Sequence, residues 1–357
     1  MKKFLSIFFI LSITISFTYA QSWVPVGNSD FSAQQVSQIS IAIDQGGTPY
    51  VFYVDGFLSP AFVMKYSGGN WVAVGDAISS WAQQPSLAID RGGTPYIAAV
   101  FGPSPIISVE KYNGSSWLST GSTGFVGYGV YPVTAIDTGG TPYVVFSDIV
   151  DGDKATVMKC NDTGWITVGS AGFSAAAAAW TSMAIDRDGT PYVVYVDGSG
   201  YGWDLGPVSV MKFISGNWVT VGSPHFSTGS AYYTSISIDT GGTPYVAYTD
   251  SVNGYKATVM KYNGSNWVAV GTVGFSAGAV SSTSLAIDSN GIPYVAYVDS
   301  ANGSRATVMK YNGTSWVNIG SPGFSIGTAG VTSMAISNSG IPYVATKISL
   351  HLILEQV

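Results

Sequence analysis

A Pro-Tyr dipeptide recurs seven times along this chain of 357 residues, and this repetition limits the possible folds more than any other feature. Successive copies lie 46 to 53 residues apart, and a Trp that opens a second motif also recurs seven times. The Pro-Tyr copies begin at Pro49, Pro95, Pro142, Pro191, Pro244, Pro293 and Pro342. The Trp residues are Trp23, Trp71, Trp117, Trp165, Trp218, Trp267 and Trp316. Such a period indicates repeats that bury their apolar faces against one another.

The unit from Thr283 to Gly320 predicts four short strands, at residues 284–288, 294–299, 306–311 and 316–320. Each is rich in Val, Ile, Tyr or Trp and is bounded by turn-forming residues, such as the hairpin signal Asn312-Gly313. Four antiparallel strands per unit, apolar on both faces, predict an all-β protein, a seven-bladed β-propeller of four-stranded antiparallel blades. A β-solenoid is the alternative, but its coils are shorter and lack hairpins.

The two ends of the chain predict how the ring closes. The segment Trp23-Val-Pro-Val-Gly27 matches only the fourth strand of a unit, whereas the last unit has no Trp strand. We therefore expect the N-terminal strand to complete the seventh blade, which leaves no open sheet edge. The tail 346–357 is unlike every other repeat. It either forms a third strand or is a truncated or frame-shifted end, and we favour an irregular or truncated last blade.

Residues 1–20 have the pattern of a secretory signal peptide. Lys2 and Lys3 precede an apolar run from Phe4 to Phe17, and small residues at Thr18 and Ala20 fit a cleavage site. We expect the propeller to span residues 21–357 and to be secreted, either extracellular or at the cell surface.

Composition excludes several classes of partner. Charged residues make up 10% of the chain, against about 25% in typical soluble proteins. The net charge is −6, and Lys and Arg do not cluster beyond the leader, so we expect no nucleic-acid partner and no membrane insertion. The single cysteine, Cys160, cannot form an internal disulfide, so stability must come from packing. We expect a monomer.

The repeat wording is similar to a known group of proteins. Its consensus runs Trp-Val-x-Val-Gly-x-x-Gly-Phe-Ser, then Ala-Ile-Asp-x-x-Gly-Thr-Pro-Tyr-Val, then Ala-Thr-Val-Met-Lys-Tyr-Asn-Gly. This resembles the repeats of secreted bacterial β-propellers, above all Bacteroidetes-type surface proteins, and more distantly tachylectin-like, sialidase and kelch propellers. The resemblance implies the fold and export. The sialidase Asp-box wording is missing from this sequence.

Residues that recur in every blade are expected to be architectural, because a single active site needs departures from the repeat. The departures do not suggest an enzyme. Glu110 and Glu355 are the only glutamates, and the three arginines do not form a triad. The two histidines, His225 and His351, have no Cys or carboxylate partner at metal-ligand spacing. We therefore expect no catalytic residues, no metal and no cofactor.

An aromatic platform is the strongest candidate for binding. Six residues before the repeated Asp, blades three, four and five carry Tyr131, Trp180 and Tyr233. An insertion after Asp197 adds Tyr201, Trp203 and Asp204. Aromatic rings stack on sugar C–H faces and anchor protein interfaces. The alternative is that these rings pack the loops together.

From these features the sequence predicts a secreted, non-catalytic binding propeller that is carbohydrate-binding and lectin-like through its aromatic loop face. A structural or protein-interaction display module of a larger surface protein is the alternative. A glycosidase or lyase comes third. The expected partner is a glycan or a surface protein.

Overall fold

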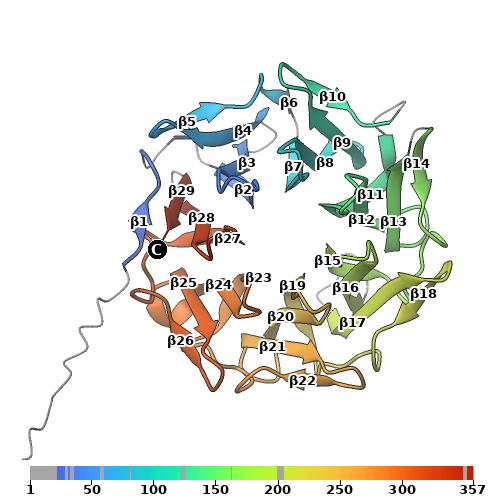
Figure 1. The fold of residues 1–357 in the computed structure, drawn as a ribbon. Coiled ribbons are helices and arrows are strands. Elements are labelled where there is room, and N and C mark those ends of the chain that lie inside the picture. Colours follow the sequence, from blue (N-terminus) through green and yellow to red (C-terminus); the bar gives the residue numbers. More distant parts are fainter. Residues whose placement is uncertain are drawn as a thin grey trace, which may run out of the picture.

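The computed structural model describes residues 22–28, 31–32, 36–56, 60–80, 82–121, 125–161, 163–198, 205–348 and 352–356. The predicted signal peptide and the predicted site residues Tyr201, Trp203 and Asp204 lie outside the described residues. Within them, strand pairing gives six antiparallel sheets around a central axis (Figure 1). Five sheets hold one blade each, and the eight-stranded sixth joins two blades through the pairing of β9 (Ile106–Tyr112) with β11 (Phe125–Ile136). This arrangement is consistent with seven four-stranded blades. In the same residues, helical structure consists of the short 3-10 turn η1 (Ser300–Asn302). None of the described helical segments is long and apolar enough to cross a membrane.

The first four blades contain the following strands. Blade one has β2 (Val36–Ile43), β3 (Pro49–Asp55), β4 (Pro60–Ser67) and β5 (Asn70–Ala73), and the short β6 (Ile78–Ser80) pairs with β4. Blade two has β7 (Ala82–Ile89), β8 (Pro95–Phe101), β9 (Ile106–Tyr112) and β10 (Trp117–Ser119). Blade three has β11 (Phe125–Ile136), β12 (Pro142–Asp148), β13 (Lys154–Asn161) and β14 (Gly164–Thr167). Blade four has β15 (Ala178–Ile185), β16 (Pro191–Gly198), β17 (Leu205–Ile214) and β18 (Asn217–Thr220).

The last three blades follow the same order. Blade five has β19 (Ala231–Ile238), β20 (Pro244–Asp250), β21 (Lys256–Tyr262) and β22 (Trp267–Ala269). Blade six has β23 (Val280–Ile287), β24 (Pro293–Asp299), β25 (Arg305–Tyr311) and β26 (Trp316–Asn318). Blade seven has β27 (Ala329–Ile336), β28 (Pro342–Ile348), β29 (Leu352–Gln356) and, from the other end of the chain, β1 (Val24–Pro25).

The ring closes as the sequence predicts. In blade seven the strand order is β1-β29-β28-β27, with Val24 opposite Gln356 and Pro25 opposite Glu355. Figure 1 shows the blue N-terminal strand lying beside the red C-terminal one. The tail 352–356 forms the third strand of this blade.

Each Pro-Tyr dipeptide begins the second strand of a blade, and this strand is the centre of the core. In β3, β12, β20 and β24 every residue is buried. Both faces of such a strand meet a neighbouring blade, so Val194 and Val246, for example, share one apolar cluster between blades four and five. Continuous apolar runs, and not strict alternation, are therefore what the repeat requires.

The recurrent Trp joins each blade to the one before it. In every blade its indole N–H donates to a backbone carbonyl of the preceding blade, over 2.7–2.9 Å. The pairs are Trp23 to Ile319, Trp71 to Val26, Trp117 to Val74, Trp165 to Thr120, Trp218 to Val168, Trp267 to Val221 and Trp316 to Val270. Trp23 and Trp71 carry this series across the two chain ends, so it forms a complete circle.

The Gly-Phe-Ser motif supports the same contact between adjacent blades, which we call the joint. Its Phe stacks on the Trp of the next blade, as in Phe275 on Trp316, where the ring centroids lie 4.3 Å apart. The Gly after each Trp strand passes directly under that ring. At Gly75 the backbone has a φ of +73°, and an added Cβ would lie 2.9 Å from the ring of Tyr112. Only glycine combines this left-handed backbone with so close an approach.

Replacing Trp267 by Phe tests the joint. The change leaves the carbonyl of Val221 without its indole donor in a buried place, which costs about 1–3 kcal/mol. W267F should therefore lower the free energy of unfolding by that amount in urea titration. W180F is the matched control, because it removes the same atoms at a half-buried ring whose N–H has no hydrogen-bond partner within the described residues. An equal loss in both variants would contradict the role of the N–H.

Glu110 is a local defect of the repeat. It occupies a position on β9 that is Met in blades one and three to six, and Met158 and Met260 pack there against clusters between two blades. Burial raises the pKa of the Glu110 carboxyl. A raised folded-state pKa means that the folded protein favours the protonated acid, so stability falls as the pH rises from the unfolded value, about 4.3, through the folded one.

E110M should therefore raise the melting temperature at neutral pH, by about 2 °C for 1 kcal/mol. The gain should shrink as the pH falls toward 4, because the acid of the parent is then neutral. Thermal melts at a series of pH values measure both effects. A gain in melting temperature that did not depend on pH would show that the size of the Glu110 side chain, and not its charge, destabilises the parent.

Candidate functional site

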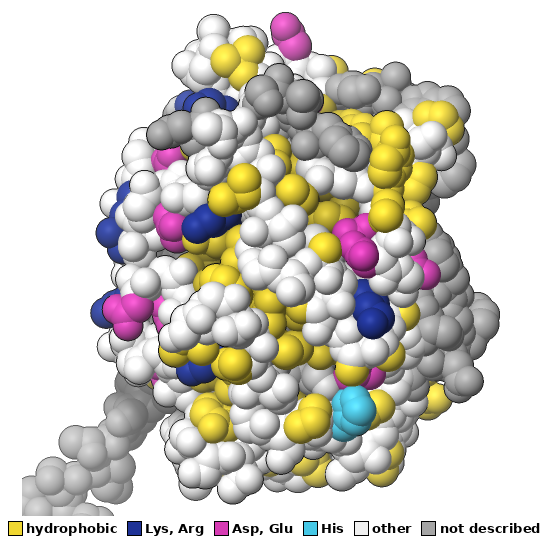
Figure 2. Space-filling view, turned by 90° about the vertical axis from the view of Figure 1, so that its right-hand side faces the viewer, with side chains coloured by type: hydrophobic (Ala, Val, Ile, Leu, Met, Phe, Trp, Pro, Cys, Tyr) yellow, Lys and Arg dark blue, Asp and Glu magenta, His cyan; other side chains and the backbone are white. Residues whose placement is uncertain are grey.

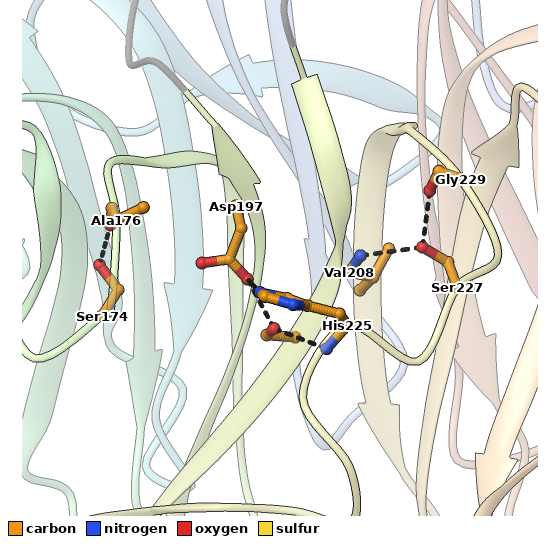
Figure 3. A network of polar contacts seen from close by, with 8 residues as sticks. Ser174, Ala176, Asp197, Val208, His225, Ser227 and Gly229 are labelled. Atoms are coloured by element: carbon orange, nitrogen blue, oxygen red, sulfur yellow. Dashed lines mark hydrogen bonds and ion pairs between the residues drawn. The ribbon is translucent and has the colours of Figure 1, made fainter.

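Three side chains of blade four meet where the repeat is broken. Asp197 is at the end of β16, Ser209 is on β17, and His225 is in the loop between β18 and β19. His225 Nε2 lies 3.0 Å from Asp197 Oδ2, and Ser209 Oγ donates to the same oxygen over 2.6 Å. The backbone N–H of His225 donates to Ser209 Oγ over 3.1 Å. Figure 3 shows the imidazole directed at the carboxylate.

A buried carboxylate thus orients an accessible imidazole. The Asp197 side chain is 9% exposed, whereas that of His225 is 52% exposed. In Figure 2 the histidine of the described chain (cyan) lies at the surface, among scattered side chains of both charge signs. Asp197 Oδ1 is buried without a hydrogen-bond partner among the described residues. When Nε2 donates to Asp197, the lone pair of Nδ1 is left available to accept a proton.

His225 stands where three of the described blades have glycine, although Asp30 occupies this position in the N-terminal copy. The matching glycines are Gly172, Gly274 and Gly323, all with positive φ, and His225 keeps the same backbone at φ +55°. In those three blades an added Cβ would lie 2.9 Å from a Cβ in the loop between strands two and three. Blade four has an insertion in that loop, after Asp197. A left-handed backbone at a residue other than glycine or asparagine is strained.

The repeated Asp of strand two has a different task elsewhere. Asp250 accepts from the Asn253 side chain over 2.8 Å, and Asp299 from Asn302 over 2.7 Å. These bonds fix the loop that follows the strand. In blade four the carboxylate accepts from the Ser209 hydroxyl, as Asp250 does from the Thr258 hydroxyl, and it contacts His225 where those two blades have the Asn. An architectural acid is therefore used to position a base.

The predicted aromatic residues Tyr131, Trp180 and Tyr233 do come together. The centroids of Tyr131 and Trp180 lie 5.8 Å apart, and those of Trp180 and Tyr233 lie 4.3 Å apart. We call these three residues the aromatic row. It crosses β11, β15 and β19, the innermost strands of blades three to five (Figure 1). All three residues are partly buried.

The backbone beneath the aromatic row belongs to the fold. Each residue has a φ of +50° to +56° at an irregularity of its inner strand, but Gln84 and Ser282 have the same φ at the matching positions. The Thr181 hydroxyl donates to the Tyr131 carbonyl over 3.0 Å, and Thr234 bonds the Trp180 carbonyl in the same way. Only the aromatic side chains are particular to these three blades.

The aromatic row and the His225 site lie toward the same end of blade four. Ala178 pairs directly with Asp197, and Trp180 follows two residues later on the same strand. Two residues of strand span about 7 Å. The row lies on the innermost strands, whereas the His225 backbone lies against β17, on the face that carries the loops from strand two to three and from strand four to one. Tyr201, Trp203 and Asp204, also predicted for this site, lie outside the described residues.

From the sequence, His225 is considered only as a metal ligand, so its contact with Asp197 is not expected. The signal in the sequence is a histidine at the position of Gly172, Gly274 and Gly323. No group of three or more His, Cys, Asp or Glu side chains in the described chain is arranged to hold a metal ion.

Comparison with known proteins identifies the fold. No protein-family profile matches the sequence, and no curated protein sequence matches it. Among solved structures, an ulvan lyase bound to a sulfated glucuronate–rhamnose fragment has a TM-score of 0.59 and 15% identity, and covers 92% of this chain and 94% of its own. An α-L-arabinanase of Penicillium chrysogenum has a TM-score of 0.52 and 13% identity, over 84% and 99%. The WD40 β-propeller domain of Doa1 has a TM-score of 0.55 and 11% identity, over 94% and 97%.

These similarities confirm the β-propeller, and they correct the functional expectation. We expected a non-catalytic binding or display module and no enzyme. That expectation is wrong, because the propellers similar to this chain include polysaccharide lyases, an arabinofuranosidase and an arabinanase. The error was to take the missing glutamate pair, arginine triad and metal-ligand histidines as evidence against catalysis, although one fold can carry many kinds of site.

Two substitutions at His225 separate the imidazole from the backbone strain. H225G and H225A both remove the imidazole, but only H225A keeps a Cβ at φ +55°. H225G should be more stable than H225A by about 1–2 kcal/mol, measured by urea denaturation. Equal stability of the two variants would show that this backbone is not strained.

Proposed function

We propose that this chain is a carbohydrate-active enzyme that cleaves an acidic polysaccharide, with His225 as its proton-transferring residue. The observation that carries the proposal is the contact of Asp197 with an accessible imidazole at a position that is glycine in three of the described blades. The similarity to propellers that are polysaccharide lyases and arabinan-degrading enzymes supports carbohydrate as the substrate class.

The side chains favour elimination over hydrolysis. Hydrolysis of a glycoside normally needs two carboxyl groups that flank the scissile bond. Asp197 is buried and bonded to Ser209 and His225, so it does not face a substrate. A carboxylate-oriented imidazole is suited instead to removing a proton from carbon.

The proposed reaction is β-elimination at a uronate residue. His225 Nδ1 takes the proton from the carbon that carries the carboxylate. The electron pair of that C–H bond forms a C=C bond to the adjacent carbon, and the glycosidic C–O bond breaks with its electrons on the departing oxygen. That oxygen then takes a proton, from the imidazolium or from water. The products are an unsaturated uronate and a new free hydroxyl, so no oxidant or reductant is required.

In this proposal the aromatic row holds the sugar chain. The half-buried rings of Tyr131, Trp180 and Tyr233 can stack on the C–H faces of consecutive sugars. The site thus has a non-polar track that leads to a base. We further propose that the protein is a secreted, monomeric surface propeller of the Bacteroidetes type, on the strength of its leader pattern and repeat wording.

Incubation with polysaccharides tests the activity. The panel is ulvan, polygalacturonate and neutral arabinan. The parent should release products with the ultraviolet absorbance of an unsaturated uronate from at least one acidic polymer and none from arabinan. H225N should lower the rate by about 10²–10⁴-fold, the usual contribution of a general acid or base.

D197N should also lower this rate, because it weakens the contact between residue 197 and His225 Nε2 that orients the imidazole. D299N is the matched control, since the same change in blade six affects only a loop. New reducing ends without unsaturated products would show a hydrolase. Equal rates for D197N and D299N would exclude Asp197 as the positioning residue.

A further inference from the structure

The face opposite to His225 carries a repeated cleft. Antiparallel strands alternate in direction, so the turns from strand one to two and from strand three to four lie at the other end of each blade. Between these turns the structure has clefts of about 490, 560, 530 and 490 Å³ at the joints of blades one and two, two and three, four and five, and five and six. We call them the joint clefts.

The joint clefts share one chemistry. Each is lined by two lysines, one from each of the two blades that meet there. The Tyr of a Pro-Tyr dipeptide and an Asn at the turn between strands three and four also line it. The lysine pairs are Lys65 with Lys111, Lys111 with Lys159, Lys212 with Lys261, and Lys261 with Lys310. Backbone from the Gly-Thr-Pro or Gly-Ile-Pro turn completes the wall in each case.

None of these lysines forms an ion pair with a carboxylate of the described residues. Within the described residues the only ion pair joins His225 to Asp197. Three of the ammonium groups lie instead 5.7–6.0 Å from the ring centroid of the tyrosine beside them, at Lys159, Lys212 and Lys261. A lysine recurs here from blade to blade, and the sequence alone assigns it no function.

Among the described residues, the acid that lines a joint cleft is Asp239, at the cleft of blades four and five, and it is already engaged. Its Oδ1 accepts from the N–H groups of Gly241 and Thr243, each over 2.9 Å. Burial, the Asp239 charge and a hydrogen bond with Asp239 raise the pKa of Tyr245, so this phenol is engaged with the carboxylate. The two ammonium groups and the Asn amide then suit a small anion on a sugar ring.

We propose that the joint clefts bind uronate carboxylates of an acidic polysaccharide, so that the polymer is held at several points on the face opposite to the catalytic one. The inference rests on the proposed function only in taking a polyuronate as the source of the carboxylates. Clefts that repeat from blade to blade suit a polymer that repeats its charge. Simultaneous occupation then strengthens binding well beyond that of a single cleft.

Two lysines allow one sharp test, because each belongs to two clefts. K111Q/K261Q removes an ammonium group from all four joint clefts. Binding is measured by affinity electrophoresis in gels that contain polygalacturonate, in an H225N background so that the probe is not cleaved. The double substitution should weaken retention by polygalacturonate at least about tenfold. R305Q/K347Q makes the same change in net charge away from these clefts and should leave retention unchanged.

Three results would overturn the inference: no retention of the parent by polygalacturonate, an equal loss in the control variant, or retention by dextran sulfate without retention by polygalacturonate. The last result would assign the clefts to sulfate groups instead. Cleavage of short uronate oligosaccharides, measured with His225 intact, should be the same in K111Q/K261Q as in the parent. Loss of polymer binding with intact cleavage supports the clefts, whereas intact binding without any cleavage would count against the catalytic proposal alone.

Discussion

The indole N–H that each blade donates to the backbone of the blade before it is the interaction on which the ring depends. A blade has only four short strands and two apolar faces, so it cannot bury its surface alone and needs a fixed position against its neighbours. The Trp supplies a large apolar ring and a directional donor at the same point. The glycine beneath the ring and the Phe stacked on it are consequences of that requirement, as Gly75 and Phe275 illustrate. Because Trp23 makes the same bond from the other end of the chain, closure uses the repeat itself.

A second circle of bonds joins the inner strands. Serines such as Ser86 and Ser284 accept from a backbone N–H of the next blade, and this occurs at six of the seven joints within the described residues. The exception lies between blades three and four, where Val133 replaces the serine. There the Thr181 bond still joins the blades, as the matching Thr bonds do at the next three joints, and Tyr131 contacts Trp180. The aromatic row thus packs between inner strands and leaves its rings partly exposed, so packing and binding are compatible roles for it.

The sequence predicted the architecture because every blade repeats the same physical requirements. Strand number, hairpin turns and the exchange of the N-terminal strand all follow from motifs that occur many times. A motif that is irregular in one repeat can therefore be recognised from the other repeats. The third strand of blade seven was the part predicted least well, since residues 352–356 carry none of the repeat wording and pair through backbone bonds. The cluster of Asp197, Ser209 and His225 could not be predicted from spacing, because its members are brought together from separate strands and a loop. The substitution of His for Gly was visible, but its meaning depends on the left-handed backbone that the structure shows.

Repetition and departure from repetition therefore serve two different tasks in this ring. Chemistry needs a single place, and it arises where blade four exchanges a glycine for an imidazole beside an acid that the other blades use for a loop. Holding a long polymer needs many equal places, and these arise where nothing departs from the repeat, at the lysines shared by adjacent clefts. The His225 site and the joint clefts lie at opposite ends of the strands, so they are built from different loops and turns. A single closed framework can then place a strained residue on one face, because every joint around it is fixed by the same Trp bond.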